Sequence, residues 1–329
     1  MGAPRRRPHA EDRVLSRLWL VTGGAGFIGS HLVAELVGRG EAVRVFDNFA
    51  TGLERNLDSF TKTIEVVRGD LRDAAAVAAA SRGATHVLHL GALGSVPRSV
   101  EDPGTSNDVN INGTLNVLVA AREAGAERVV FSSSSSVYGA NTEIPKRVGM
   151  ATDPVSPYAV TKQAGESYTR VFWRVYGLPT VALRYFNVFG ENQRPDSAYA
   201  AVIPKFMDSA LRGQPLEIHG DGLQSRDFTY VDNVVSANLL AAVAEGVAGE
   251  VFNIACGASY TLLDIAGALE NALDKPLERR HVDARAGDVR ASLADIEPAA
   301  ARLGYRVLVD FDEGLARTWR SFRERRGAA

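Results

Sequence analysis

The sequence predicts an α/β fold, with a doubly wound parallel sheet and a smaller C-terminal α/β domain. Short apolar runs rich in β-branched residues alternate with helical patterns through the first half of the chain. This alternation is typical of strand–helix–strand units. Several of the runs are apolar throughout, as expected for parallel strands that helices cover on both faces.

The elements of the first half follow one another regularly. We expect strands at 18–22, 42–46, 64–67, 86–90, 128–132 and 180–184. The apolar spacing between them predicts helices at 27–39, 73–82, about 106–124 and 157–176. The crossovers that join successive parallel strands should be right-handed.

The chain changes character after Phe186. A segment rich in Pro, Gly and polar residues (189–204) overlaps a helix near 202–212 and precedes a hairpin-like stretch, PLEIHGDGLQSRDFTYV. A helix near 232–245 and a strand at 250–255 should then return to the sheet. The predicted division is a larger domain of 17–186 plus about 230–256, a smaller one of about 187–229 plus 257–329, and a flexible extension, 1–16.

Composition excludes several classes of protein. With 46% hydrophobic and 23% charged residues the chain is globular, and a net charge of −2 gives no field for nucleic acid or an acidic membrane. The one cysteine, Cys256, excludes an internal disulfide and suits a reducing cytosol. The six histidines lack metal-ligand spacing, so we expect no metal. No signal-peptide core or 18-residue apolar run is present, which favours a cytoplasmic location.

A glycine pattern follows the first predicted strand. The stretch LWLVTGGAGFIGSHL places Gly23, Gly26 and Gly29 between that strand and the first helix. Glycines there permit a tight turn and close approach of a pyrophosphate, which the helix N-terminus attracts. In this strand–loop–helix setting the pattern indicates a Rossmann-like dinucleotide site.

Two acidic residues follow the next strands. Asp47 closes the second strand, eighteen residues after Gly29, where it would accept the adenosine ribose hydroxyls and repel a 2′-phosphate. It therefore favours NAD over NADP, although a surface aspartate could also close a strand. Asp70, in RGDLRD, follows the third strand within reach of an adenine, but Asp70 or Asp73 could equally be a helix N-cap.

The stretch SPYAVTKQAGE holds Tyr158 and Lys162 one helical turn apart. An ordinary half-buried helix would explain an isolated pair of this kind. The alternative is a general base whose pKa is lowered by the neighbouring ammonium. A charge at about 4 Å in an effective dielectric near 20 contributes roughly 4 kcal/mol, or about three pKa units.

Four motifs together resemble the extended short-chain dehydrogenase/reductase family. They are the glycine loop, NINGT (110–114), the serine run before VYG (137–139), and SPYAVTK (156–162). The chain is similar over about 17–320 to the NAD-dependent nucleotide-sugar epimerases and dehydratases of that family. The resemblance implies that Tyr158 is the catalytic base, that Lys162 binds the nicotinamide ribose, and that Ser134, or else Ser135, bridges to the sugar. It implies NAD contacts from Gly23, Gly26, Phe27, Ile28, Asp47, Asn48, Asp70, Leu71, Leu90, Gly91, Ala92, Asn110, Tyr158, Lys162 and Tyr185.

The serine run also bears on the reaction. Dehydratases that resemble this chain carry an Asp-Glu pair just before VYG, where this chain has Ser135 and Ser136. Elimination of water is therefore disfavoured, and 4-epimerisation through a transient 4-keto sugar remains. A non-catalytic NAD-binding protein is a rival, but such a protein would be expected to lack the Tyr or the Lys.

The resemblance further implies a UDP-hexose substrate and a homodimer built on the helices near 106–124 and 157–176. Arg194 matches an arginine that UDP-glucuronate 4-epimerases use for the C6 carboxylate, so the sequence favours the uronate. Ser292, where some epimerases have a bulky tyrosine, leaves room for UDP-N-acetylglucosamine, the alternative together with UDP-glucose. The implied substrate contacts are Gly94, Ser95, Ser134, Asn187, Arg194, Val202, Arg226, Arg285, Asp288 and Ser292.

Overall fold

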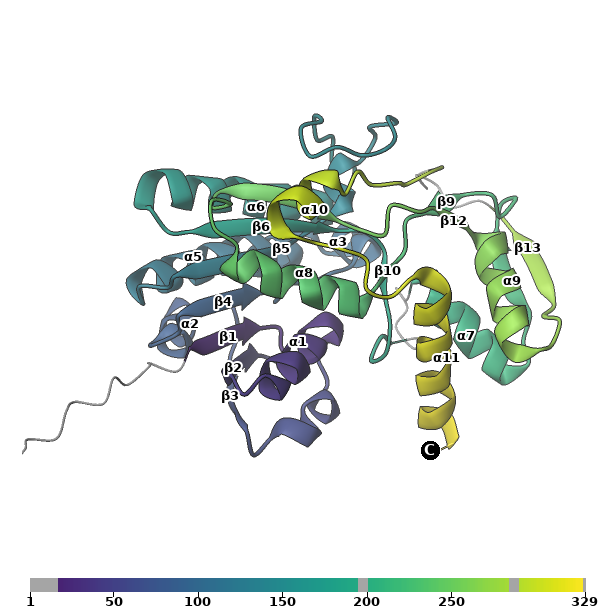
Figure 1. Ribbon diagram of the computed structural model, residues 1–329, viewed down its shortest axis with the longest axis horizontal. Coiled ribbons are helices and arrows are strands. Elements are labelled where there is room, and N and C mark those ends of the chain that lie inside the picture. Colours follow the sequence, from purple (N-terminus) through teal and green to yellow (C-terminus); the bar gives the residue numbers. More distant parts are fainter. Residues whose placement is uncertain (1–16, 195–200, 284–289, 328–329) are drawn as a thin grey trace, which may run out of the picture.

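The computed structural model of the protein describes residues 17–194, 201–283 and 290–327. The predicted extension, 1–16, lies outside these ranges, as do Arg285 and Asp288. A central sheet with helices on both sides forms one part of the molecule, and a smaller group of helices and short strands lies at one end of it (Figure 1). Among the described helices, none is both long and apolar enough to cross a bilayer.

The sheet contains seven strands, all parallel, in the order β11-β6-β5-β4-β1-β2-β3. All six strands predicted in the first half are present, and the strand predicted at 250–255 pairs with β6 at the edge. The bounds are β1 Leu18–Thr22, β2 Ala42–Asp47, β3 Ile64–Arg68, β4 His86–His89, β5 Arg128–Ser134, β6 Thr180–Tyr185 and β11 Glu250–Ile254.

Each face of the sheet packs on its own helices. Leu20 and Val129 face one layer, whereas their neighbours Val21 and Val130 face the other, since side chains alternate along a strand. The first layer contains α2 (Ala74–Ser81), α5 (Gly113–Glu123) and α6 (Pro157–Tyr176), and the second contains α1 (Phe27–Gly38) and α8 (Val231–Val243). These helices agree with the predicted ones, except that 106–124 is divided into α4 (Pro103–Asn107), a π turn (Asp108–Asn112) and α5.

The smaller group corrects one expectation. The segment 215–231 is not a hairpin: β8 (Leu216–His219) pairs in parallel with β13 (Arg279–Val282). β9 (Ser225–Arg226) pairs with β12 (Tyr260–Thr261), and β10 (Thr229–Tyr230) pairs with β7 (Val188–Phe189). The turn between β8 and β9 redirects the chain, and each strand finds a partner far away in sequence. The remaining helices are α3 Val96–Glu101, α7 Val202–Arg212, α9 Leu262–Leu273, α10 Glu297–Leu303 and α11 Phe311–Gly327, with 3₁₀ turns at Glu54–Asn56, Asp58–Phe60 and Ser135–Tyr138.

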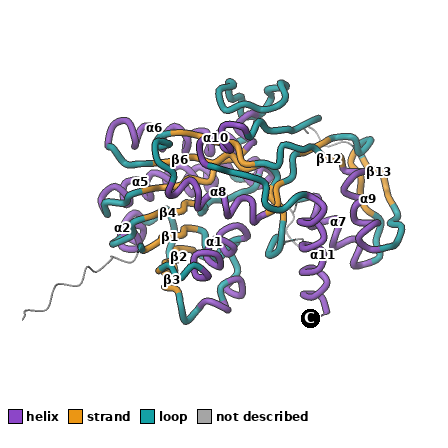
Figure 2. Tube along the Cα trace, in the orientation of Figure 1, coloured by secondary structure: helices purple, strands orange, loops and turns teal. Residues whose placement is uncertain are grey.

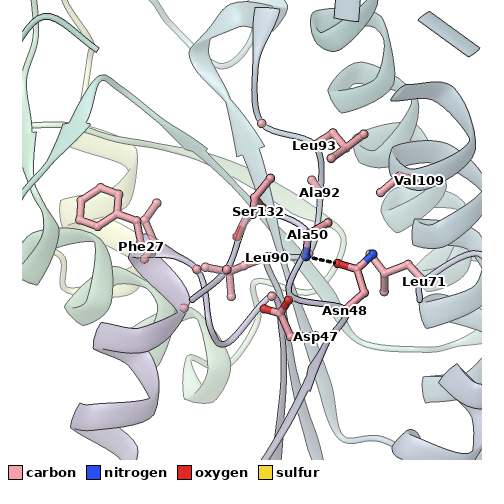
Figure 3. A pocket seen from close by; sticks show the side chains of 18 of the residues that line it. Phe27, Asp47, Asn48, Ala50, Leu71, Leu90, Ala92, Leu93, Val109 and Ser132 are labelled. Carbon is pink, nitrogen blue, oxygen red and sulfur yellow. Dashed lines mark hydrogen bonds between the residues drawn. The ribbon is translucent and has the colours of Figure 1, made fainter. Parts of the chain in front are cut away.

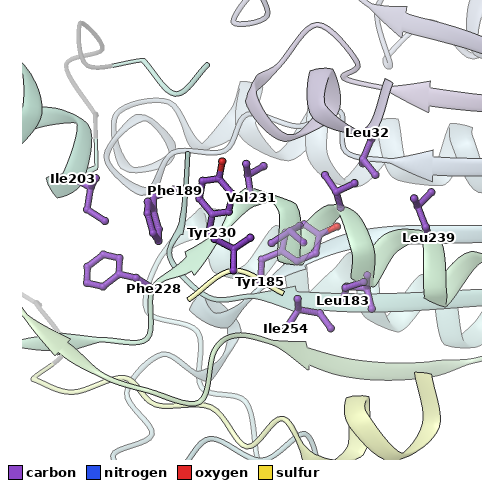
Figure 4. Close-up of a cluster of buried hydrophobic side chains, with 14 of the residues drawn as sticks. Leu32, Leu183, Tyr185, Phe189, Ile203, Phe228, Tyr230, Val231, Leu239 and Ile254 are labelled. Atoms are coloured by element: carbon purple, nitrogen blue, oxygen red, sulfur yellow. The ribbon is translucent and has the colours of Figure 1, made fainter. Parts of the chain in front are cut away.

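One hydrophobic core joins the two groups of elements (Figure 4). Tyr185 at the end of β6 and Val231 at the start of α8 connect the sheet to Phe189, Phe228 and Ile203 of the smaller group. Figure 2 shows how loops pass between the groups more than once. Burial across this junction gives the smaller group a fixed position beside the carboxyl ends of the strands.

Those carboxyl ends are where a ligand is expected. The chain proceeds from β1 to β2 and β3 on one side and to β4, β5 and β6 on the other. In open parallel sheets the loops diverge at such a reversal and leave a crevice outside the strand ends. The glycine loop follows β1, at this reversal.

Candidate active site

The loop between β1 and α1 is shaped by two glycines. Gly23 has φ +71°, and a Cβ there would lie 2.7 Å from the backbone nitrogen of Gly91. A Cβ on Gly29 would lie 2.1 Å from the carbonyl oxygen of Gly23. Neither position can accept a side chain without moving backbone, so the loop stays folded tightly against the N-terminus of α1 and leaves its N–H groups available to a phosphate.

Asp47 fixes the next part of the site. Its carboxylate accepts hydrogen bonds from the N–H of Ala25, at 3.0 Å, and of Phe49, at 2.8 Å. It is only 8% exposed, yet it lines the cavity. The carboxylate thus joins the glycine loop to the loop after β2 and presents negative charge to whatever binds there.

A cavity of about 420 Å³ runs along the carboxyl ends of the strands (Figure 3). In this view Phe27 lies at the left, Asn48 and Leu71 lie at the right, and Asp47 lies between them. Most residues predicted to contact the cofactor or the near part of the substrate line this cavity: Gly23, Gly26, Phe27, Ile28, Asp47, Asn48, Asp70, Leu71, Leu90, Gly91, Ala92, Gly94, Ser95, Tyr158, Lys162, Tyr185 and Arg194.

The two aspartates of RGDLRD have different places. Asp73 is the N-cap of α2 and accepts from the N–H groups of Ala75 and Ala76. Asp70 lines the cavity instead, where Arg72 and Asn48 donate to its carboxylate. The hydrogen bond from Arg72 holds the pKa of Asp70 well below its usual range, so this carboxylate is charged at neutral pH.

Asn110 lies behind the cavity wall. It is 2% exposed, accepts from the N–H of Leu93 at 2.7 Å, and donates to Thr161 Oγ1 at 3.0 Å. These bonds tie the loop after β4 to helix α6, one turn from Tyr158. Asn110 therefore supports the wall of the site, and among the described residues it is not part of the cavity lining.

Tyr158 and Lys162 both face the cavity from α6. Ser156 caps the helix by accepting from the N–H of Ala159, and the N–H of Tyr158 donates to Ser99 Oγ at 3.0 Å. Lys162 is 5% exposed, and its ammonium donates to the carbonyl of Ser132 at 2.8 Å. Both side chains thus meet the carboxyl end of β5 from the first turns of the helix.

The pKa of Tyr158 is not lowered by Lys162 in the way that the sequence suggests. Burial raises the pKa of the Tyr158 phenol, and a hydrogen bond with Ser134 lowers it in part. Burial also lowers the pKa of the Lys162 ammonium to about 8. Because this ammonium points to Ser132 and lies 5.8 Å from the centre of the Tyr158 ring, it does not by itself lower the pKa of Tyr158 as predicted.

The serines of the run are distinguished by their partners. Ser134 is the one that interacts with the Tyr158 hydroxyl. Ser135 starts the following 3₁₀ turn, and neither Ser134 nor Ser135 is among the described residues that line the cavity. Ser132 Oγ and Tyr185 Oη are 2.9 Å apart.

A second cavity, of about 730 Å³, lies in the smaller group of elements. Three of the residues predicted to contact the substrate line it: Asn187, Val202 and Arg226. Ser292 lies nearby, bonded through its N–H to the carbonyl of Ser225 at 3.0 Å, and is partly buried. The two cavities place the predicted cofactor and substrate residues in adjoining parts of the molecule.

The sequence argument missed several residues of the first cavity. Arg98 of α3 lines it beside Tyr158, as do Thr51, Gly52 and Leu53 of the loop after Asp47. The stretch GSVPRS contains Arg98, and only its place next to Gly94 and Ser95 could have suggested a role. Loop residues of this kind carry no periodic signal, so their position became visible only in three dimensions.

The lining fits NAD. The glycine cradle accepts a pyrophosphate, and the charged Asp47 disfavours an additional phosphate on the adenosine ribose. Asp70 and Asn48 offer polar atoms further along the wall, and Lys162 offers a buried ammonium at the other end. Among the described residues, no group of three or more His, Cys, Asp or Glu side chains could hold a metal ion.

Known proteins resemble the chain closely. A solved UDP-N-acetylglucosamine 4-epimerase from Methanobrevibacter ruminantium, in complex with UDP-N-acetylmuramic acid, is 38% identical with a TM-score of 0.90, covering 94% of this chain and 99% of that one. A Thermus thermophilus UDP-glucose 4-epimerase, solved in complex with NAD, is 38% identical with a TM-score of 0.84, covering 93% and 99%. A UDP-glucuronate 4-epimerase of Arabidopsis thaliana is 35% identical over 90% of this chain and 74% of its own length.

The family assignment rests on the same region as the site. Residues 19–255 match the model of the NAD dependent epimerase/dehydratase family. This range contains all of the sheet except Leu18, together with the glycine loop and helix α6. The chain is a member of the NAD dependent epimerase/dehydratase family, and NAD is its cofactor.

Proposed function

We propose that the protein is an NAD-dependent 4-epimerase of a UDP-hexose, with UDP-glucuronate and UDP-galacturonate as the favoured pair. The observation that carries the epimerase assignment is the meeting of Tyr158, Lys162 and Ser134 at the end of β5, beside the glycine loop. A general base, a cation and a hydroxyl relay are the groups needed for reversible oxidation of a sugar hydroxyl.

Each of the three groups has a distinct task. Tyr158 takes the proton from the C4 hydroxyl and returns it later, and Ser134 orients that hydroxyl. Lys162, held by the Ser132 carbonyl, binds the nicotinamide ribose and keeps a positive charge near the phenol. When bound, NAD supplies a reversible hydride acceptor at C4 and the further positive charge of its oxidised ring.

The neighbouring residues disfavour elimination. Ser135 and Ser136 stand directly after Ser134, and neither offers a carboxyl group for loss of water from C5 and C6. Ser136 Oγ is buried without a hydrogen-bond partner among the described residues. This part of the chain therefore favours release of the C4 epimer rather than a dehydrated product.

The UDP part has a matching site. We propose that the second cavity, with Asn187 and Arg226 on its wall, holds the uridine diphosphate. The side-chain amide of Asn187 donates to the carbonyl of Asp227 at 3.0 Å, which fixes the residue next to Arg226. A guanidinium suits a diphosphate because its planar fork can bond two oxygens at once.

Two arginines support the uronate. Arg194, in the loop after β7, and Arg98, in helix α3, line the same cavity as Tyr158. A carboxylate at C6 gains from a cation in a partly desolvated site, whereas a hydroxymethyl group does not. Removal of Arg194 should therefore act selectively on the acidic substrate.

UDP-N-acetylglucosamine is the second candidate, and Ser292 is the observation in its favour. A serine beside the second cavity leaves more room for an acetamido group than a large aromatic side chain would. The similarity to the UDP-N-acetylglucosamine 4-epimerase from Methanobrevibacter ruminantium adds support. Incubation with UDP-glucuronate, UDP-N-acetylglucosamine and UDP-glucose, followed by NMR of the products, tests both candidates; faster turnover of the acetamido sugar would reject the uronate.

Arg194→Ala separates the role of the cation from that of the loop. Loss of one partner of a desolvated charge pair costs about 2–5 kcal/mol. We therefore expect kcat/KM for UDP-glucuronate to fall by roughly 30-fold or more, with little change for UDP-glucose. Arg39→Ala, at a surface ion pair with Glu35, is the matched control. Equal losses on both sugars would instead assign Arg194 to loop support.

A further inference from the structure

The last three residues of β5 extend beyond one of its neighbours. β4 ends at His89, which pairs with Phe131, so Ser132, Ser133 and Ser134 pair only with β6 on the other side. Yet this segment carries both the carbonyl that holds Lys162 and the hydroxyl that meets Tyr158. Something other than a second strand must hold it in place.

Helix α6 supplies two contacts to this segment. Lys162 reaches the carbonyl of Ser132, and Glu166, one turn later, accepts a hydrogen bond of 2.5 Å from Ser133 Oγ. The side chain of Ser133 is oriented toward the helix, on the face of β5 opposite to the side chains of Ser132 and Ser134, because successive side chains alternate along a strand. Glu166 and Ser133 are 4% and 3% exposed, so little water competes for the bond.

Glu166 is itself fixed by a buried ion pair. Arg184 Nε and Nη2 each donate to its carboxylate at 2.8 Å, and Arg184 is 2% exposed. Arg184 is the direct neighbour of Ser133 across the β5–β6 ladder. Its guanidinium also lies 4.7 Å from the centre of the Tyr138 ring, just after the serine run.

We propose that Glu166 is a positioning residue, which holds Ser133 so that the projecting end of β5 keeps Ser134 against Tyr158. Arg184 keeps the Glu166 carboxylate in the one orientation that accepts from both β5 and β6. The three consecutive serines thus have separate tasks: Ser132 anchors Lys162, Ser133 anchors the strand, and Ser134 faces the substrate. The inference rests on the catalytic roles given to Tyr158 and Ser134 in the proposed function.

Ser133→Ala is the variant that tests it. It removes the hydroxyl but leaves the Glu166–Arg184 pair, whereas Glu166→Ala would strand a buried guanidinium and unfold part of the chain. We expect kcat to fall roughly ten- to a hundredfold through misplacement of Ser134, with KM nearly unchanged. Loss of the Ser134 bond should also raise the pKa of Tyr158, so the acid limb of the kcat–pH profile should move to higher pH.

Ser81→Ala is the matched control, because Ser81 Oγ is buried on α2, donates to the carbonyl of Val77 at 2.9 Å and does not line the cavity. It should leave kcat and the pH profile as in the wild type. The positioning role is overturned if Ser133→Ala behaves like Ser81→Ala, or if its kcat falls while the acid limb stays in place. Tyr158→Phe is measured alongside: if it stays active the catalytic assignment fails first, whereas an inactive Tyr158→Phe with an unaffected Ser133→Ala rejects the positioning role alone.

Discussion

Tyr158 lies where desolvation works against its use as a base. Burial raises the pKa of its phenol, and Ser134 lowers that pKa only in part. Lys162 carries a pKa lowered to about 8 and points its ammonium to a backbone carbonyl. If Tyr158 is the base, as we propose, the positive charge of bound, oxidised NAD would supply the remaining stabilisation of the phenolate. Proton removal would then depend on the presence of the oxidised cofactor.

Tyr158→Phe should lower turnover by about 10²–10⁴-fold, the usual loss for a missing general base. Folding and NAD content should stay as in the wild type, because the hydroxyl makes no bond that holds the helix. Tyr176→Phe is the matched control on the same helix, since Tyr176 is 49% exposed. Steady-state kinetics with the best UDP-sugar gives the comparison, and wild-type turnover in Tyr158→Phe would exclude this residue as the base.

Asp47 leads to a prediction about the bound cofactor. A 2′-phosphate beside this charged, hydrogen-bonded carboxylate would meet a like charge, and an epimerase returns its hydride in each cycle. The purified protein should therefore contain NAD and need little added cofactor. Chromatography of a denatured extract measures this. Absence of any nicotinamide, together with dependence on added NADP, would contradict it.

At the scale of single residues, the sequence alone predicts some roles and does not predict others. Gly23, Tyr158 and Lys162 stand in local patterns whose spacing already fixes their geometry, so the sequence alone predicts their common site. Ser134 and Ser135 differ only in what lies across the strand end, and Arg98 approaches the cavity through the packing of α3. Such roles depend on partners remote in sequence, which no spacing within one segment encodes.

Among the elements, the junction of β10, β11 and the 291–294 segment depends on one buried carboxylate. Asp227 is fully buried and accepts from the N–H groups of Cys256, Gly257 and Ala294. From its position next to Arg226, Asp227 thereby joins the end of β11 to the segment that contains Ser292. The predicted hairpin over 215–231 failed at this place because these three partners, not the adjacent strand, fix the chain.

The same carboxylate predicts a pH dependence. Burial raises the pKa of Asp227 to about 6 from an ordinary 3.8, against the lowering effect of its N–H donors. Between about pH 4 and pH 6 the folded state therefore binds a proton that the unfolded state has lost. This group's contribution to stability is fully present below about pH 4 and is lost as the pH rises through about 6. The change is about 2–3 kcal/mol.

Asp227→Asn should remove that dependence. Urea unfolding at pH 4, 5, 6 and 7 measures it as the difference between variant and wild type. Asp221→Asn is the control, since the pKa of Asp221, at an exposed ion pair with Arg290, is lowered to about 2, so its effect has the opposite sign. A difference between Asp227→Asn and wild type that stays constant over this range would contradict the prediction.

On the scale of the whole molecule, α6 exposes apolar side chains on its outer face. Val160, Val171 and Val175 are 46%, 45% and 66% exposed, and with Ala164 and Tyr168 they form one stripe at helical spacing. Leu115 and Val119 of α5 lie partly exposed in the same layer. We propose that this apolar stripe packs against a second copy of the chain, in the homodimer that the family resemblance implies.

Val171→Asp tests this dimer away from the catalytic end of the helix. If two copies bury the stripe against each other, an aspartate there would place an unpaired charge in an apolar contact, which is strongly destabilising. Size-exclusion chromatography with light scattering should then give about twice the 35.3 kDa chain mass for the wild type and the single chain mass for the variant. Val243→Asp is the matched control, because Val243 is 52% exposed on α8, across the sheet from α6. It should remain dimeric, and a monomeric wild type, or a dimeric Val171→Asp, would mean that the stripe is not the contact between subunits.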